Sequence, residues 1–519
     1  MRTSLRCFCK ELGGRVNVFG PALLNDLNPK SGLAQRTFGS LISSSASGAV
    51  SDAIVPVIEF LRVPVERLYN KIRSQAVTIL VAFLKVRSRL TAPRFIFGDQ
   101  SMKALSIALV VAATLGFTFA AEPDGLILPS GFHVTVVTEG LGPVRHLAVR
   151  ENGDIFVSTP VDKQNSGGGI IALHLDKNHN AVQVEHFGTV DGGTAIRFYK
   201  GALYAATASA IYRFTFSSGG TLLPGKDPEI IVDGMPASHP GFNRANIALA
   251  FDEKGDMFVA LEGSANLCTA PNTTEGAPPV GLKPCPDLKI RAGVWRFNAN
   301  KIGQKFPTDG EQLATGIRDI SSLDWSPADG HLYGIVHGRD NTHRIWPEMI
   351  SAEDDDHIAD EMHRITRGAD FGWPYTYYDG VRNVRLIAPE YGGDGKTPAP
   401  AGVYSTPVLT FQSPRAAPVD LVFYSGDKFP ASYHKGAFVV LHGTRSKNGY
   451  DVVFVPFGKS GKAGSPTVFA DGFAAFDPSS KTPSVARYRP IGAAVGPDGA
   501  LYIADSQKGR IWRIAYGAD

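Results

Sequence analysis

The sequence predicts an all-β fold, a six-bladed β-propeller of four-stranded antiparallel blades. One phrase recurs six times between Val144 and Tyr516: an apolar run, a turn, a second apolar run that ends in small residues, and a third strand. Most of the turns carry Gly beside Asp, Asn or Lys, as hairpins of antiparallel strands require. Repeats of this kind cannot bury both faces alone and must stack. An all-β sandwich is the alternative, and six ordered copies fit it poorly.

The last copy is the clearest, with strands at 491–495, 501–505 and 509–514 around the turn at Pro497-Asp498-Gly499. The earlier copies have the same order, and their three strands are predicted at 147–149, 155–158 and 170–173; 194–196, 203–206 and 211–214; 247–251, 257–260 and 294–297; 323–325, 332–335 and 362–365; 419–423, 436–441 and 452–455. A further alternating run, Phe132–Val137, can close the ring by pairing with the last blade.

The front of the chain differs in kind. Met102 and Lys103 precede an apolar stretch, 104–121, that ends in small residues, which is typical of a secretory signal peptide. Because this stretch lies far from the first residue, either Met102 is the true start and residues 1–101 are an extension that is not translated, or 104–121 is a membrane anchor. We therefore expect a propeller over 122–519 and a periplasmic or secreted protein, with membrane contact only through an uncleaved anchor.

Charge and cysteines support this division. Residues 1–101 carry a net charge of +8, whereas the remainder carries −5, so the total of +3 hides an acidic second part. An acidic propeller is a poor partner for nucleic acid, which requires a basic face. Cys268 and Cys285 share one loop and are expected to form a disulfide in an oxidising compartment, the alternative being two free thiols.

Four segments are expected in the loops that surround the central channel of the propeller, where such folds bind ligands. They are Leu313–Asp319, Val336–Asp340, Gly368–Tyr378 and Leu441–Arg445. Together with the ending at 497–514, they resemble the glucose/sorbosone dehydrogenase family. The sorbosone dehydrogenase branch fits best, through 423–426, His442-Gly443 and 449–453.

This resemblance implies a propeller that uses pyrroloquinoline quinone (PQQ) and calcium. Such an enzyme oxidises an aldose or a sugar aldehyde by hydride transfer to PQQ and passes electrons to a soluble acceptor. The Arg-Asn pair of the family, which contacts the quinone, falls on Arg318 and Asp319, so an acid replaces the Asn. The calcium loop, which supplies backbone carbonyls, falls on Gly338 and Arg339, with Asp340 next to them. The arginine that holds the cofactor carboxylates corresponds to Arg445.

The catalytic base departs from the family pattern. The family His that takes the sugar proton corresponds to Arg244, whose guanidinium stays protonated and cannot act as a base. His239, five positions earlier, is a hypothetical replacement, and His337 is another candidate; a channel His bonded to the backbone is the alternative reading of His337. The lysine of the glucose branch corresponds to Ser425, which carries no charge.

PQQ has three carboxylates, so its pocket requires cations. Arg244, Arg318, Arg339 and Arg445 are predicted in mouth loops, and arginine suits carboxylates through its fork of donors. Solvated loop charges are the alternative. Tyr377 or Tyr378 is a candidate platform for stacking a sugar, although packing beneath the pocket also explains the aromatic cluster around Trp373.

Two other functions stay open at this point. The changes at Arg244 and Asp319 also fit a propeller that has lost the reaction and binds a carbohydrate or a protein partner. A calcium-dependent lactonase-like hydrolase is the third possibility, and it would require an acidic metal cage, for which Asp319 and Asp340 are the candidates.

Overall fold

The computed structural model describes the following residues: 119–121, 125–160, 169–188, 195–217, 220–236, 247–271, 277–411, 416–444, 448–458, 461–475 and 477–517. The predicted extension, and nearly all of the predicted signal or anchor segment, lie outside them. Among the described residues, no helix has the length and apolarity to cross a bilayer.

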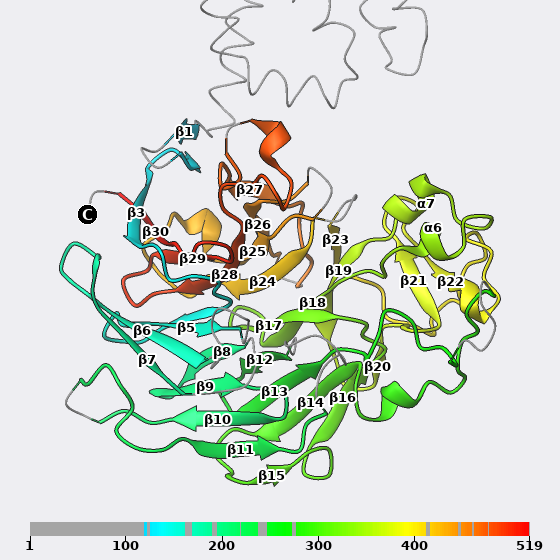
Figure 1. The fold of residues 1–519 in the computed structure, drawn as a ribbon, viewed down its shortest axis with the longest axis horizontal. Helices are drawn as coiled ribbons and strands as arrows, with labels where there is room; N and C mark the ends of the chain where they lie inside the picture. The colour runs from blue at the N-terminus through cyan, green and yellow to red at the C-terminus, as the bar shows by residue number, and fades with distance from the viewer. Residues whose placement is uncertain are drawn as a thin grey trace, which may run out of the picture. The chain divides into compact units, whose positions relative to one another are not determined.

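The described residues form six antiparallel blades arranged as a β-propeller (Figure 1), which confirms the predicted fold class. The first three blades are, in chain order, β4 (Leu147–Val149), β5 (Ile155–Thr159), β6 (Gly169–Leu175) and β7 (Ala181–Phe187) in blade 1; β8 (Ile196–Tyr199), β9 (Ala202–Ala206), β10 (Ala210–Phe214) and β11 (Glu229–Asp233) in blade 2; and β12 (Ile247–Phe251), β13 (Asp256–Leu261), β14 (Gly293–Asn298) and β16 (Glu311–Thr315) in blade 3.

The other three blades repeat the order. They are β17 (Ile320–Ser326), β18 (His331–Val336), β19 (Asp360–Ile365) and β23 (Leu409–Phe411) in blade 4; β24 (Pro418–Phe423), β25 (Gly436–Leu441), β26 (Asp451–Pro456) and β27 (Thr467–Ala470) in blade 5; and β28 (Pro490–Val495), β29 (Leu501–Asp505), β30 (Ile511–Tyr516) and β3 (Phe132–Thr138) in blade 6. Two blades also carry a short parallel strand at the outer edge: β15 (Gln304–Lys305) beside β11, and β20 (Ala369–Asp370) beside β16.

The ring closes through the pairing that the sequence suggested. β3 pairs antiparallel with β30, from Phe132 opposite Tyr516 to Thr138 opposite Ile511. The first strands of consecutive blades contact one another in turn, and β28 contacts β4. The sixth blade therefore joins the two ends of the described propeller. N-terminal to β3, the strands β1 (Phe119–Ala121) and β2 (Ile127–Pro129) pair with each other.

Stacking of the blades explains why many strands are apolar on both faces. All five residues of β9 and all six of β25 are buried. On β9, Leu203 packs with Phe156 of blade 1, whereas the next residue, Tyr204, packs with Leu249 of blade 3. Successive side chains of a strand point to opposite faces, so a blade between two neighbours needs apolar residues at every position.

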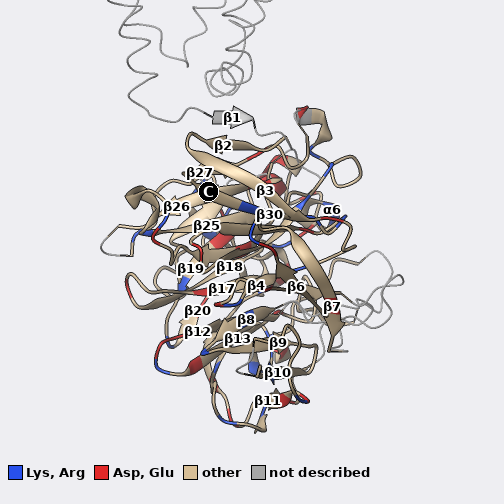
Figure 2. Cartoon of the chain, turned by 90° about the vertical axis from the view of Figure 1, so that its left-hand side faces the viewer, with Lys and Arg blue, Asp and Glu red and all other residues tan. Residues whose placement is uncertain are grey.

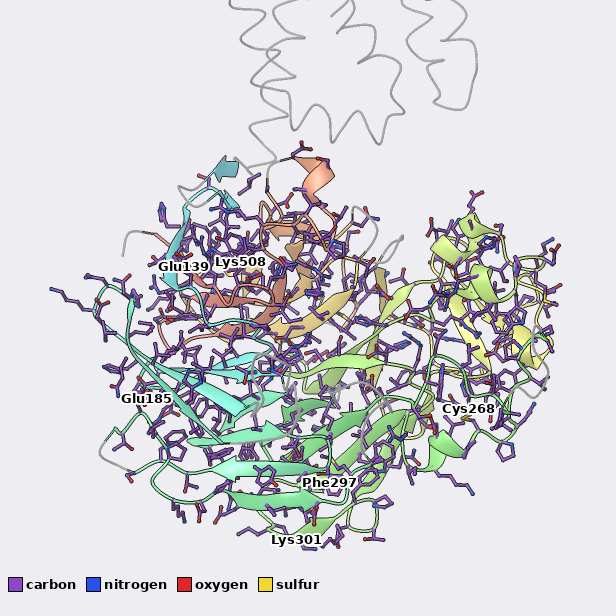
Figure 3. The ribbon with its side chains drawn as sticks, in the orientation of Figure 1. Glu139, Glu185, Cys268, Phe297, Lys301 and Lys508 are labelled. Atoms are coloured by element: carbon purple, nitrogen blue, oxygen red, sulfur yellow. A yellow bond between two sulfur atoms is a disulfide. The ribbon has the colours of Figure 1, made fainter. Side chains whose placement is uncertain are left out.

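A separate group of elements, called the insertion lobe, interrupts blades 3 and 4 and lies at the right of Figure 1. It consists of residues 262–271, 277–292, 337–359 and 371–408, with η2 (Pro286–Lys289), α6 (Thr342–Ile345), α7 (Ala352–Asp356), β21 (Thr376–Asp379), β22 (Val384–Ile387) and η3 (Pro389–Tyr391). Cys268 and Cys285 form the predicted disulfide within it, and Cys268 is labelled in Figure 3. Tyr391 donates its hydroxyl to the Cys268 carbonyl at 2.9 Å, which ties the disulfide loop to η3.

Candidate functional site

The blade topology gathers the predicted site residues at one end of the ring. In each blade the first and second strands are joined at one end, so the loop from the second to the third strand and the connection to the next blade both lie at the other end, called the mouth face. Arg318 and Asp319 are in the connection from β16 to β17, and His337–Asp340 begin the loop from β18 to β19. The fold therefore brings together two segments that the sequence separates.

Glycine permits the close approach of backbones here. Gly316 has φ +78°, and a Cβ atom on it would lie 2.6 Å from the Gly372 nitrogen. A Cβ on Gly338 would lie 2.5 Å from the Ala359 carbonyl oxygen. Side chains at these two positions would push the mouth loops apart.

Arg318 joins the two segments. Its Nη1 donates to the Gly338 carbonyl at 2.7 Å, and its Nη2 donates to the Asp340 carboxylate at 2.6 Å. Its Nε is buried and has no hydrogen-bond partner in the described part of the chain. A buried donor without an acceptor is unfavourable, so the Nε–H is suited to donate to a ligand oxygen.

Asp319 pairs with His337. The Nδ1 of His337 lies 3.4 Å from the Asp319 carboxylate, and its Nε2 donates to the Pro418 carbonyl at 2.6 Å. Burial lowers the pKa of His337, but the charges of Asp319 and Asp360 and these hydrogen bonds outweigh it and raise the pKa to about 9. The imidazole is thus protonated at neutral pH, and it would have to lose a proton before it could act as a base. Its catalytic role stays a prediction.

The Arg339 side chain points into the insertion lobe. Its Nη2 donates to both Glu390 carboxylate oxygens, at 2.7 and 2.9 Å, and both side chains are buried. The guanidinium carbon lies 5.4 Å from the centroid of the Trp346 ring and 5.8 Å from that of Tyr377. Glu390 therefore neutralises the charge of Arg339, so the side chain is not available as a cation for the cofactor. The predicted role of the Arg339 backbone carbonyl as a metal ligand stays a prediction.

A narrow cleft that is partly open to solvent lies between blade 4 and the insertion lobe. It is lined by Gly316, Arg318, Val336, His337, Gly338, Arg339, Glu361, Phe371, Trp373, Thr376, Tyr377, Tyr378 and Arg385. Trp373, Tyr377 and Tyr378 are all buried, so the aromatic cluster mainly packs beneath the cleft. Burial is also the main reason why the pKa of Tyr377 is raised to about 12.

Arg385 is a cleft residue that the sequence interpretation missed. It comes from β22 and donates to Glu361 at 2.6 Å, and Glu361 also lies 3.0 Å from the Nε2 of His363. Burial raises the pKa of Glu361, but Arg385 and His363 outweigh it and lower it overall, and burial lowers the pKa of His363. The pair is therefore Arg385⁺ and Glu361⁻ beside a neutral imidazole. The sequence offered one signal, a charged residue in a short strand next to the aromatic cluster.

Other predicted residues fall elsewhere. His442 lies on the mouth face of blade 5, where its Nδ1 accepts from Arg489 at 2.9 Å and its Nε2 lies 2.9 Å from the Ser506 hydroxyl. His239, Arg244 and Arg445 lie outside the described residues. Their predicted roles as base and cofactor ligands stay predictions.

For calcium, the described residues contain no group of three or more His, Cys, Asp and Glu side chains that could hold a metal ion. The Gly338 carbonyl and the Asp340 carboxylate both accept from Arg318. In this arrangement the predicted metal loop is occupied by a guanidinium, and the acidic cage required by a hydrolase is not found among the described residues.

Comparison with known proteins gives the following matches. An uncharacterized protein of Borreliella burgdorferi is 25% identical over 211 residues, which cover 40% of this chain and 49% of that protein, about half its length. A pyrroloquinoline quinone-dependent sugar dehydrogenase of Hypocrea jecorina is 21% identical over 424 residues, 78% of this chain and 87% of that protein. The calcium structure of a Trichoderma reesei enzyme of carbohydrate-active enzyme family AA12 has a TM-score of 0.58 at 16% identity, over 77% of this chain and 99% of that chain, which shows a shared fold.

A family profile described as TrAA12-like matches residues 126–379 and 394–517. These ranges include all six blades and the described mouth loops of blades 3 and 4. The match covers well over half of the chain, and the fold agrees with it. This protein belongs to the TrAA12-like family.

Proposed function

We propose that this protein is an exported quinoprotein that oxidises an aldose or a sugar aldehyde with PQQ as its cofactor. The observation that carries the proposal is the mouth cleft, where Arg318, protonated His337 and Arg385 lie around aromatic side chains. The donors of these three side chains and the aromatic floor suit a planar anion with several carboxylates, which would compete with the Asp and Glu side chains that now pair with them. The name of the Hypocrea jecorina relative and the sequence resemblance favour the same cofactor.

PQQ, when bound, would accept two electrons and a proton from the sugar as a hydride. Arg318 would donate its unpartnered Nε–H to a cofactor oxygen. His337, held by Asp319 and Pro418, would add a fixed positive charge beside it. Proton removal from the sugar hydroxyl is assigned to His239 on the sequence prediction, and Arg244 and Arg445 are assigned as further carboxylate ligands.

Calcium is assigned no step. The two oxygens that would bind it, from Gly338 and Asp340, both accept from Arg318, so an ion would have to displace the guanidinium. Within the sugar dehydrogenases, the sorbosone type is the specificity that we propose, on the sequence motifs alone. Export to the periplasm or the medium, and a soluble electron acceptor, complete the proposal.

The test is a titration of the purified full-length chain with PQQ, with and without Ca²⁺, followed by the absorbance of the bound quinone and by dye reduction with aldoses. We expect Arg318→Gln to weaken PQQ binding at least 10-fold, since a charge-assisted hydrogen bond is lost. Arg296→Gln is the control, because Arg296 pairs with Asp256 and Glu311 on blade 3. Failure of the unaltered protein to bind PQQ would overturn the proposal.

A propeller that has lost the reaction is the second candidate. Arg244 and Asp319, which stand where the family has His and Asn, favour it. The same titration separates the two candidates, because this one predicts PQQ binding without dye reduction, or binding of a sugar alone.

A further inference from the structure

Three cationic side chains surround one buried tyrosine on the mouth face of blade 6. The ring centroid of Tyr488 lies 4.9 Å from the Lys508 ammonium, 5.2 Å from the Arg487 guanidinium carbon and 4.5 Å from that of Arg510. Tyr488 is 7% exposed, so the cations cover its ring. An aromatic face attracts cations only weakly, and the three charges repel one another.

Only one of these cations forms an ion pair among the described residues. Arg510 is buried and pairs with Glu139, which lies beside Lys508 in Figure 3; the Gly140 nitrogen also donates to the Lys508 carbonyl at 3.1 Å. Arg487 and Lys508 are exposed, and neither has an ion pair within the described residues. The cluster therefore presents two positive charges to solvent, and Asp505 is the acidic side chain that attracts Lys508.

The positive charge of this cluster contrasts with the net negative charge of the propeller. Residues 102–519 carry a net charge of −5. In Figure 2 the basic and acidic residues are interspersed along the ribbon. Two exposed cations that lie close together on an acidic propeller attract an anion to this place and not to the whole surface.

The cluster is connected to the mouth by hydrogen bonds. Asp505 accepts from the backbone nitrogens of Lys508 and Arg489, both at 2.7 Å. Arg489 in turn donates to His442 at 2.9 Å and to the Gly443 carbonyl at 2.6 Å. Arg487 and Lys508 are thus held next to the loop after β25, which also contains the predicted cofactor ligand Arg445.

We propose that Arg487 and Lys508, set against Tyr488, form the docking site for an anionic electron acceptor. This inference rests on the proposed function and identifies the partner of the same site. Oxidation of one sugar hydroxyl to a carbonyl releases two electrons and two protons. Two one-electron acceptors, each bound in turn at the cluster, take the electrons, and the protons pass to solvent. The partner that we propose is a one-electron redox protein whose acidic surface complements these two charges.

The first arm of the test measures binding without turnover. Ferrocyanide, an anion that cannot accept an electron from the protein, is titrated into the full-length chain at low ionic strength by calorimetry. We expect saturable binding that weakens at least 10-fold in Arg487→Glu/Lys508→Glu and on addition of 0.2 M salt. The control is Lys254→Glu/Lys301→Glu, which changes the net charge equally at exposed positions on the other end of blade 3.

The second arm measures reoxidation of the sugar-reduced enzyme by ferricyanide, by an acidic c-type cytochrome and by the cationic dye phenazine methosulfate. We expect Arg487→Glu/Lys508→Glu to slow reoxidation by the acidic cytochrome at least 10-fold and to leave the cationic dye unaffected. Slowing of ferricyanide alone would overturn docking of a redox protein. Equal loss in the control, or no ferrocyanide binding to the unaltered chain, would overturn the site. A further outcome is that the variant loses ferrocyanide binding but the unaltered chain does not oxidise sugar. The cluster would then be an anion site, and both its role in electron transfer and the proposed function would be refuted.

Discussion

Arg197 of blade 2 donates to Asp420 of blade 5 across the central channel, with an Nη2–Oδ1 distance of 3.2 Å. The same carboxylate accepts from the Ser322 hydroxyl at 2.7 Å and from the Ala493 nitrogen at 2.8 Å, and lies 3.0 Å from the Nδ1 of His146. Asp420 is fully buried. One side chain thus connects five of the six blades directly beneath the mouth face, and it holds the ring to a single register.

Asp420→Asn is expected to destabilise the propeller by about 3–5 kcal/mol at pH 7, because it removes the buried carboxylate that the partly buried Arg197 and His146 share. Burial raises the pKa of Asp420, but His146 and Arg197 outweigh it and hold the pKa well below its ordinary value. This stabilisation is present above about pH 4 and is lost as the pH falls toward the folded-state pKa, so the difference from the unaltered protein should shrink in acid. Urea unfolding across pH 2–7 measures this difference in stability, and Asp427→Asn at an exposed position is the control. Equal stability of Asp420→Asn and the unaltered protein at pH 7 would show that the contacts of Asp420 do not stabilise the ring.

Asp451→Asn is expected to stabilise the protein at pH 8 by about 2–4 kcal/mol. Burial raises the pKa of Asp451 to about 7, although Lys481 opposes it, and its Oδ1 has no hydrogen-bond partner among the described residues. Because the folded-state pKa is raised, the native protein is favoured at low pH and loses this contribution as the pH rises from about 4 to 7. Thermal unfolding should therefore show a large gain at pH 8 and almost none near pH 4, and a gain independent of pH would contradict the assignment.

Glu390→Gln is expected to loosen the insertion lobe, because Arg339 would keep its buried charge without a partner, at a cost of about 3–5 kcal/mol. Hydrogen exchange should rise in η3 and around α6, while the outer strands of blades 1 and 6 keep their protection. Glu348→Gln is the matched control, since Glu348 is exposed in the same lobe. Unchanged exchange in the lobe would mean that the disulfide loop alone holds it.

Removal of the disulfide should affect the same region. The bond joins cysteines 17 residues apart, and the chain-entropy model gives about 3 kcal/mol for a loop of this size. Cys268→Ser/Cys285→Ser is therefore expected to unfold at a lower urea concentration than the oxidised protein, and reductant should lower the unaltered protein to the same midpoint. A midpoint that reductant does not move would contradict this.

His239→Ala is expected to lower kcat for sugar oxidation about 100-fold or more and to leave PQQ affinity unchanged, as loss of a general base does. Arg244→His, which restores the family residue, should recover activity in the His239→Ala background. Stopped-flow reduction of the PQQ-loaded enzyme separates the chemical step from cofactor binding. If His337→Ala abolishes activity and His239→Ala does not, the base is His337.

Much of the architecture could be predicted because its signals are local. A hairpin turn and two short apolar runs are enough to identify the first two strands of a blade, and each predicted strand overlaps an observed one. The closing strand at Phe132–Thr138 was also visible, since alternation is a property of neighbouring residues. The lobe strands β21 and β22 were not predicted. Their aromatic residues were interpreted as part of a mouth loop, because the same side chains both pack in the lobe and line the cleft.

The candidate site could be predicted only in part, because its side-chain contacts join residues that are distant in the sequence. The motifs identified Arg318, Asp319 and the loop from His337 to Asp340, which lie together on the mouth face. They did not indicate that Arg318 occupies the predicted metal loop, or that Arg385 enters the cleft from the lobe. Side-chain direction depends on partners that are far away in the chain.

The order of turns and apolar runs in the sequence determined by itself that the protein is a ring of six blades, because backbone reversal and strand alternation are set by adjacent residues. Only the tertiary structure decided which charges neutralise one another, as in the pairs of Arg197 with Asp420 and Arg339 with Glu390. Those pairs join residues up to 223 positions apart, and the free energy of a buried charge depends on what surrounds it in space.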